Sequence, residues 1–181
     1  PKVHDYLAEF KRDVLDFYDC FTVGEGPRME PEVALSYVRE GKDKVLDMMI
    51  NFAHMEADCF ITDFLQRPFD LVKLKKAFTK WQTKMYGKGW NALYMENHDH
   101  PRIISRYGSE KYRVESGKSI AASYLFQRGT PFVYQGQEIG MINTPLPSLD
   151  DYKDIMVKNN ARIARSLGLS KETVLRLAQK A

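Results

Sequence analysis

Residues 90–102 read WNALYMENHDHPR, and this stretch decides the fold. Its first half, residues 90–95, is short and mostly apolar, which is typical of a buried β-strand. At Glu96 the sequence turns polar, and Pro101 ends the polar cluster as in a loop. A strand that runs directly into acidic and histidine side chains indicates an α/β protein, because such proteins place their chemistry at the carboxyl ends of parallel strands.

Three more short segments rich in apolar residues are predicted to be strands: 20–23, 45–52 and 131–134. Apolar residues at helical spacing, together with cap signals such as Asp70, Gly168 and Ser170, predict the intervening helices. These helices are expected at 4–17, 32–38, 70–85, 115–127, 149–167 and 171–180.

A leading helix followed by repeated strand–helix units predicts an α/β fold with parallel strands. Two layouts fit that order, a doubly wound sheet or part of a (β/α)₈ barrel. A complete barrel needs about 250 residues, so four strands in 181 residues correspond to about half of one. We expect strand–helix units over residues 1–143 and a helical tail over residues 144–181.

Composition excludes several classes of protein. The chain is 44% hydrophobic and 28% charged, and its net charge of +3 is spread without a basic block, so no nucleic-acid partner is expected. No apolar run reaches the ~18 residues of a membrane span, and no signal peptide opens the chain, which starts at Pro1. The two cysteines are not in a metal spacing, and we expect thiols of a cytoplasmic protein.

Two carboxylates are predicted to lie just beyond strand ends, Glu25 after residues 20–23 and Asp99 after residues 90–95. Glycoside hydrolysis requires a protonated acid for the leaving oxygen and an ionised carboxylate near the anomeric carbon. Two strand-end carboxylates fit that task. Spacing alone favours solvated loop acids or helix caps over a catalytic pair, and both interpretations stay open at this level.

Histidines flank the second carboxylate. His98 and His100 would lie on opposite sides of an extended segment, and no third ligand is evident, so no metal site is predicted. Hydrogen bonding to a polyol substrate or to a neighbouring carboxylate suits them better. The segment 136–140, GQEIG, lacks the lysine and the spacing of a phosphate loop, and no cofactor is expected.

Three segments together carry a resemblance to a known family. WNALYMENHDHPR at 90–102 resembles the strand-seven signature of the α-amylase family, glycoside hydrolase family 13. TVGE at 22–25 resembles its strand-five signature, and GTPFVYQGQEIGM at 129–141 its strand-eight segment. The resemblance implies the C-terminal half of a (β/α)₈ barrel. SLDDYKD at 148–154 is similar to the branch of oligo-1,6-glucosidases, dextran glucosidases and trehalose-6-phosphate hydrolases.

The resemblance also implies roles for single residues. Glu25 would be the general acid/base, and Asp99 would hold sugar hydroxyls and stabilise the transition state. His98 would hydrogen-bond the sugar, and Arg102 would shape the neighbouring subsite. His100 stands where glutamine is usual, toward the aglycone side, so the linkage preference stays open.

The implied function is that of a retaining α-glucosidase acting on short oligosaccharides with α-1,6 or α-1,4 linkages. The family's nucleophile follows a pattern like Gly-Phe-Arg-x-Asp, which this sequence does not contain, so the isolated chain is expected to be inactive. A half barrel is expected to pair with its missing half or with itself. Alternatives are a truncated, non-catalytic sugar-binding relic, or a segment of a trehalose-6-phosphate hydrolase or sucrose isomerase.

Overall fold

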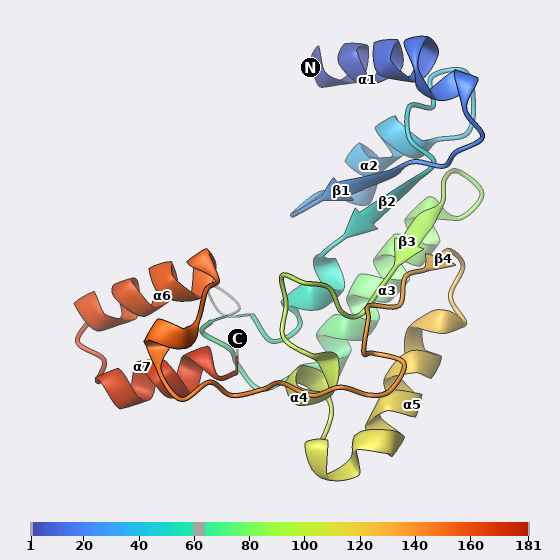
Figure 1. The fold of residues 1–181 in the computed structure, drawn as a ribbon. Helices are drawn as coiled ribbons and strands as arrows, with labels where there is room; N and C mark the ends of the chain where they lie inside the picture. Colours follow the sequence, from blue (N-terminus) through green and yellow to red (C-terminus); the bar gives the residue numbers. More distant parts are fainter. Residues whose placement is uncertain (1, 60–63, 181) are drawn as a thin grey trace. The chain divides into compact units, whose positions relative to one another are not determined.

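The computed structural model describes residues 2–59 and 64–180, and its described part contains one sheet of four parallel strands (Figure 1). The strands follow one another in the sheet in chain order, and each neighbouring pair is parallel. They are β1 (Val23–Gly26), β2 (Met48–Asn51), β3 (Asn91–Leu93) and β4 (Thr130–Pro131). The predicted α/β fold with parallel strands is confirmed.

Helices alternate with these strands. Their bounds are α1 (Lys2–Asp13), α2 (Pro31–Val38), α3 (Leu71–Met85), α4 (Ile103–Tyr107), α5 (Arg113–Leu125), α6 (Ile155–Ser166) and α7 (Lys171–Ala178). Short 3₁₀ turns lie at Leu15–Phe17, Ala53–Glu56, Glu110–Tyr112 and Leu149–Asp151. Among these elements, the five-residue helix α4 has no counterpart in the sequence prediction.

The chain divides into two compact units, apart from the residues outside the described ranges. The first is formed by Pro1–Ala57, Leu71–Tyr94 and Tyr124–Phe132, and the second by Asp58–Asp70, Met95–Ser123 and Val133–Ala181. The first unit holds all four strands. Helices α2 and α3 pack against each other and against the sheet (Figure 1). The core of this unit is built from Ala34, Leu35, Val38, Met49, Trp81 and Met85.

The predicted position of the first strand was wrong. β-Branched and aromatic residues favoured 20–23, with Glu25 in the following loop, but the strand covers Val23–Gly26 and Glu25 lies within it. Phe21 is 67% exposed and contributes no burial. Pairing decides the outcome: β1 hydrogen-bonds to β2 with Val23 opposite Met48 and Gly26 opposite Asn51, so a glycine-rich segment becomes a strand because its partner lies beside it.

The start of this pairing is fixed by a reciprocal contact between two side chains. The Thr22 N–H and hydroxyl donate to one Asp47 carboxylate oxygen at 2.8 and 2.9 Å, and the Asp47 N–H donates to the Thr22 hydroxyl at 2.9 Å. Burial acts to raise the pKa of Asp47. Hydrogen bonds from Thr22 and the nearby Lys44 ammonium outweigh it, so the pKa of Asp47 is lowered.

The first helix leaves its apolar side uncovered within the first unit. The predicted helix over 4–17 is confirmed as α1, which ends at Asp13 and is followed by a 3₁₀ turn. None of its residues is buried, and Val3, Tyr6 and Phe10 are 45%, 63% and 49% exposed. An amphipathic helix normally buries such a face.

In the second unit, α6 and α7 pair around a small core of Phe64, Ala161, Ala164, Val174 and Ala178 (Figure 1). Ser170 caps α7 as predicted, its side chain accepting from the Thr173 N–H. The predicted continuous helix over 149–167 was wrong at its start. The Ser148 side chain caps a separate 3₁₀ turn, and α6 begins only after its own cap, Asp154.

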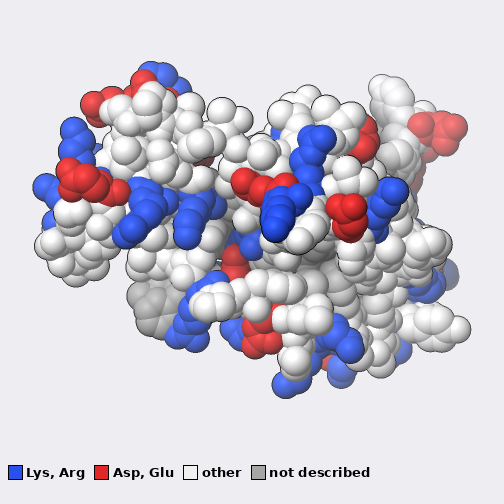
Figure 2. Space-filling view, turned by 90° about the horizontal axis from the view of Figure 1, so that it is seen from below, with Lys and Arg blue, Asp and Glu red and all other residues white. Residues whose placement is uncertain are grey.

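Charged side chains of both signs are interspersed on the face of the molecule drawn in Figure 2. No helix in the described part of the chain is long and apolar enough to span a bilayer.

Candidate functional site

Glu25 is the third residue of β1, in the first unit, with its side chain exposed. Its backbone lies opposite Ile50 of β2, so the strand pairing fixes the position of the Glu25 Cα. Glycines flank it. A side chain at Gly24 would come within 2.6 Å of Leu46, and one at Gly26 within 3.0 Å of Met29. Small residues on both sides therefore let the strand lie close to its surroundings, with Glu25 pointing outward.

The loop of residues 97–101 follows β3 along the chain and belongs to the second unit. The Asp99 N–H donates to the Asn97 side-chain oxygen at 3.1 Å, which forms a tight local turn. His98 and Asp99 stand on this turn with side chains 77% and 54% exposed. The His98 Nε2 lies 3.4 Å from an Asp99 carboxylate oxygen. The turn thus presents an imidazole and a carboxylate side by side.

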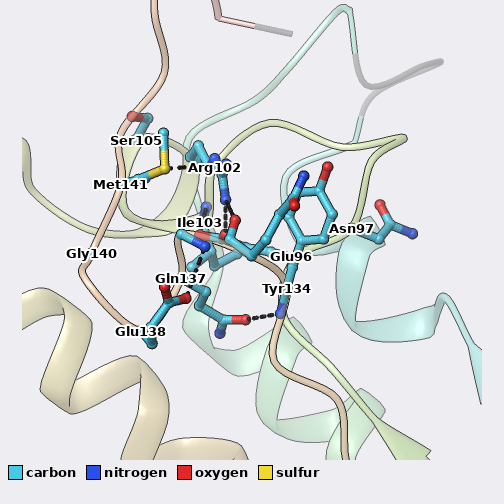
Figure 3. Close-up of polar contacts among 12 residues, drawn as sticks. Glu96, Asn97, Arg102, Ile103, Ser105, Tyr134, Gln137, Glu138, Gly140 and Met141 are labelled. Atoms are coloured by element: carbon cyan, nitrogen blue, oxygen red, sulfur yellow. Dashed lines mark hydrogen bonds and ion pairs between the residues drawn. The ribbon is translucent and has the colours of Figure 1, made fainter.

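A buried carboxylate stands directly before this loop. The Glu96 side chain is 1% exposed, and its two oxygens take different donors. Oε1 accepts from the Ile103 N–H at 2.9 Å, and Oε2 accepts from Arg102 Nη1 at 2.9 Å (Figure 3). The sequence placed Glu96 in the polar cluster without a role, because nothing in the pattern indicates burial at the end of a strand.

Arg102 makes further contacts with the 134–143 segment. Its Nη1 also donates to the Gln135 carbonyl at 2.8 Å, and its guanidinium lies 5.0 Å from the centre of the Tyr134 ring. Its backbone N–H donates to the Asn143 side-chain oxygen at 2.8 Å. Gly136, with φ of 90°, lies so close to Met141 and Arg102 that a side chain there would collide. Arg102 is therefore held in place by acceptors of the protein itself.

Three of the predicted site residues line one cavity of about 300 Å³ in the second unit. Its polar lining includes Asn97, His98, His100, Arg102, Tyr134 and Asn143. Asp99 lies on the same turn, next to two of these residues. Glu25 is not among the lining residues and lies in the first unit. In the described ranges, no three His, Cys, Asp or Glu side chains are grouped so as to hold a metal ion.

A second buried ion pair, which no sequence pattern indicated, joins Asp58 to α4. The Arg106 Nη2 and Nε donate to the two Asp58 carboxylate oxygens at 2.7 and 2.9 Å, and the two side chains are 0% and 2% exposed. The partners are 48 residues apart in the chain. Bidentate geometry and full burial make this pair a strong link between Asp58 and α4.

Replacing Arg106 with Met is expected to destabilise the protein by about 3–5 kcal/mol, because the charge of Asp58 would stay buried without its partner. Denaturant unfolding of the complete gene product measures this difference. Arg162→Met is the matched control, since Arg162 is exposed on α6, and a change within about 0.5 kcal/mol is expected there. Equal losses in the two variants would contradict the assigned role of the pair.

The chain resembles known proteins over nearly its whole length. The family profile described as "Alpha amylase, catalytic domain" matches residues 1–176. An oligo-1,6-glucosidase of Parageobacillus thermoglucosidasius is 46% identical over 161 residues, which cover 88% of this chain and 28% of that protein. A trehalose-6-phosphate hydrolase of Bacillus subtilis is 36% identical over 182 residues, covering 99% of this chain and 32% of that protein.

Solved structures agree with this assignment. The trehalose-6-phosphate hydrolase of Bacillus licheniformis superposes with a TM-score of 0.89 at 38% identity, over 99% of this chain and 33% of that one. An isomaltulose synthase of Erwinia rhapontici superposes with a TM-score of 0.88 at 31% identity, with the same coverage. The chain therefore spans about a third of the length of the relatives it matches. It belongs to the α-amylase family, whose catalytic-domain profile matches residues 1–176.

Proposed function

We propose that the complete protein is a retaining α-glucosidase that hydrolyses short α-linked glucosides. The observation that carries this proposal is the pair of exposed acids in their motifs, Glu25 on β1 and Asp99 on the loop that leaves β3 of the same parallel sheet. The carboxyl ends of such strands form the active-site face in barrels of this type. The similarity to several oligo-1,6-glucosidases supports an α-1,6 linkage, and α-1,4 is the second candidate.

In the proposed reaction Glu25 acts twice. It first donates a proton to the leaving glycosidic oxygen while a carboxylate nucleophile, supplied from outside residues 1–181, attacks the anomeric carbon. A glycosyl-enzyme forms, and Glu25 then takes a proton from the attacking water. Hydrolysis of that intermediate releases the sugar with its original anomeric configuration.

The 97–101 loop would bind the sugar at the reacting centre. Asp99, as a carboxylate, would hold sugar hydroxyls and stabilise the positive charge that develops at the anomeric carbon. His98 would donate a hydrogen bond in the same subsite. His100 and Arg102, which line the cavity beside the turn, would face the leaving group.

The uncovered apolar side of α1 supports a second part of the proposal. Val3, Tyr6 and Phe10 stay exposed in these 181 residues, and the parts of the protein outside this sequence would cover them. Residues 1–181 alone are then expected to self-associate and to show no hydrolysis. A clean monomer in light scattering at high concentration would argue against this.

The proposed activity is tested on the complete gene product with a panel of isomaltose, maltose, trehalose 6-phosphate and sucrose. Release of glucose from isomaltose is expected, and NMR of the fresh product should show the α anomer. Release of the β anomer would refute the retaining course. Binding of these sugars without any turnover would favour the alternative of a non-catalytic, sugar-binding relic.

Trehalose-6-phosphate hydrolysis is kept as the second candidate because of the likeness to two hydrolases of that name. Its signature in the same panel is turnover of trehalose 6-phosphate in preference to isomaltose. Conversion of sucrose to an isomer without release of glucose would instead indicate the reaction of an isomerase.

We also propose a cytoplasmic location, since Cys20 and Cys59 are both thiols. Cell fractionation tests the location.

A further inference from the structure

The proposed sugar-binding side chains depend on their loop for direction. Asp99 and His98 are 54% and 77% exposed, so more than half of each side chain is left uncovered by its neighbours. The contacts of Asp99 lie within the turn, where its N–H donates to Asn97 and its carboxylate faces His98. Because neither side chain is held by packing, each points where the backbone of the 97–101 loop directs it.

Both ends of this loop meet on one buried carboxylate. Glu96 directly precedes the loop, and the two residues that follow it, Arg102 and Ile103, donate to the two Glu96 oxygens at 2.9 Å each (Figure 3). One side chain thereby joins the residue before the loop to the residues after it. Such a contact closes the loop at its base and removes conformations in which the ends separate.

The charge of Glu96 makes this closure depend on Arg102. A carboxylate that is 1% exposed is costly unless a positive partner and hydrogen bonds compensate it. Arg102 supplies the charge, and the same Nη1 also donates to the Gln135 carbonyl at 2.8 Å. Its backbone N–H is held by Asn143. The base of the loop is therefore fixed to the 134–143 segment as well.

We propose that Glu96 is a positioning residue for the glucosidase reaction: its carboxylate, paired with Arg102, closes the 97–101 loop and so directs Asp99 and His98 toward the sugar. This inference rests on the proposed function. Glu96 is buried beneath the loop and does not itself contact the substrate. Its effect on the reaction passes through Asp99 and His98.

The test replaces Glu96 with Gln in the complete gene product. Glutamine keeps the size of the side chain and an acceptor for the Ile103 N–H, but it removes the negative charge opposite Arg102. Asp154→Asn is the matched control, an acid-to-amide change at the exposed cap of α6, where asparagine caps equally well. Both substitutions are made in the wild-type and in the Asp99→Asn background.

In the wild-type background, Glu96→Gln is expected to lower kcat on isomaltose by about 10²-fold with little change in KM, because the group that stabilises the transition state is misdirected. In the Asp99→Asn background the same change should lower kcat by less than about tenfold, since of the two side chains that it positions only His98 is unaltered. Hydrogen exchange of the 97–103 amides should accelerate in Glu96→Gln and stay unchanged in the control.

Equal losses in both backgrounds, or a loss no larger than in Asp154→Asn, would overturn the inference. Turnover that survives Glu25→Gln and Asp99→Asn would end the proposed function and this inference together. Turnover lost in those two variants but kept in Glu96→Gln would end the inference alone. Should Glu96→Gln fail to fold, Glu96→Asp, which keeps the charge but shortens the side chain that reaches Arg102 and Ile103, takes its place, with the same expected contrast between the two backgrounds.

Discussion

Glu25→Gln in the complete protein is expected to lower kcat on isomaltose by about 10⁴-fold, the upper end of what a positioned proton donor contributes. The amide has the shape of the acid but cannot donate a proton to the leaving sugar. Folding should be unaffected, because the side chain is exposed on β1. Steady-state kinetics with a natural disaccharide give this number directly.

The same variant should respond to the leaving group. The dinitrophenolate of a dinitrophenyl α-glucoside departs without protonation. Formation of the glycosyl-enzyme should therefore be much less impaired on that substrate than on isomaltose. Glu32→Gln is the control, since Glu32 is an exposed acid on α2 that pairs with Lys84. It should leave both rates within about twofold of wild type. An equal loss on both substrates would argue that Glu25 serves another purpose than protonating the leaving oxygen.

Asp99→Asn is expected to have the second largest effect, about a 10³-fold loss of kcat, comparable with the removal of one strong electrostatic partner of a transition state. The neutral amide can still hydrogen-bond a hydroxyl, but it cannot oppose a developing positive charge. Most of the loss should therefore fall on kcat and little on KM. Kinetics on isomaltose separate the two parameters.

Binding of a cationic iminosugar checks the same point without turnover. Its affinity should fall far more in Asp99→Asn than the affinity of neutral glucose, because only the cation reproduces the charge of the transition state. Asp150→Asn, at an exposed position in the 3₁₀ turn of the second unit, should change neither affinity. Parallel losses for the two ligands in Asp99→Asn would mean that Asp99 only holds hydroxyls.

The sequence predicted most elements because their signals are local. Pro31 at the first turn of α2 and Ser170 before α7 mark helix starts through their own backbone chemistry, and the structure has both helices where those residues indicate. The start of α6 was misplaced for an equally local reason. Two capping side chains, Ser148 and Asp154, lie six residues apart, and the second one begins the longer helix.

The position of β1 could not be predicted from its own residues. The segment VGEG has a low intrinsic preference for strands, whereas the residues before it favour one. The pairing with β2 overrides that preference, and Gly24 is needed because the side chains of Leu46 and Met49 lie too close for a Cβ. A contact between segments 25 residues apart has no signature in either segment alone.

The candidate site shows the same division. Glu25 and Asp99 could be proposed as acids of a site from the sequence, because each lies in a motif whose residues are contiguous in the chain. The supporting pairs, Glu96 with Arg102 and Asp58 with Arg106, become visible only in the structure. The sequence does not distinguish a buried glutamate or aspartate from an exposed one, because burial depends on packing against segments that are distant in the chain.

The Thr22–Asp47 contact helps to set the direction of Glu25, the proposed proton donor. A slip of β1 by one residue along β2 would turn every side chain of the strand to the opposite face, so Glu25 would point away from its present side. The pKa of Asp47 is lowered in the folded protein, so its contribution to stability is present above the ordinary carboxyl value of 3.8 and is lost as the pH falls below it. Protonation of Asp47 at low pH therefore weakens the contact with Thr22 that orients Glu25, in addition to lowering the stability of the fold.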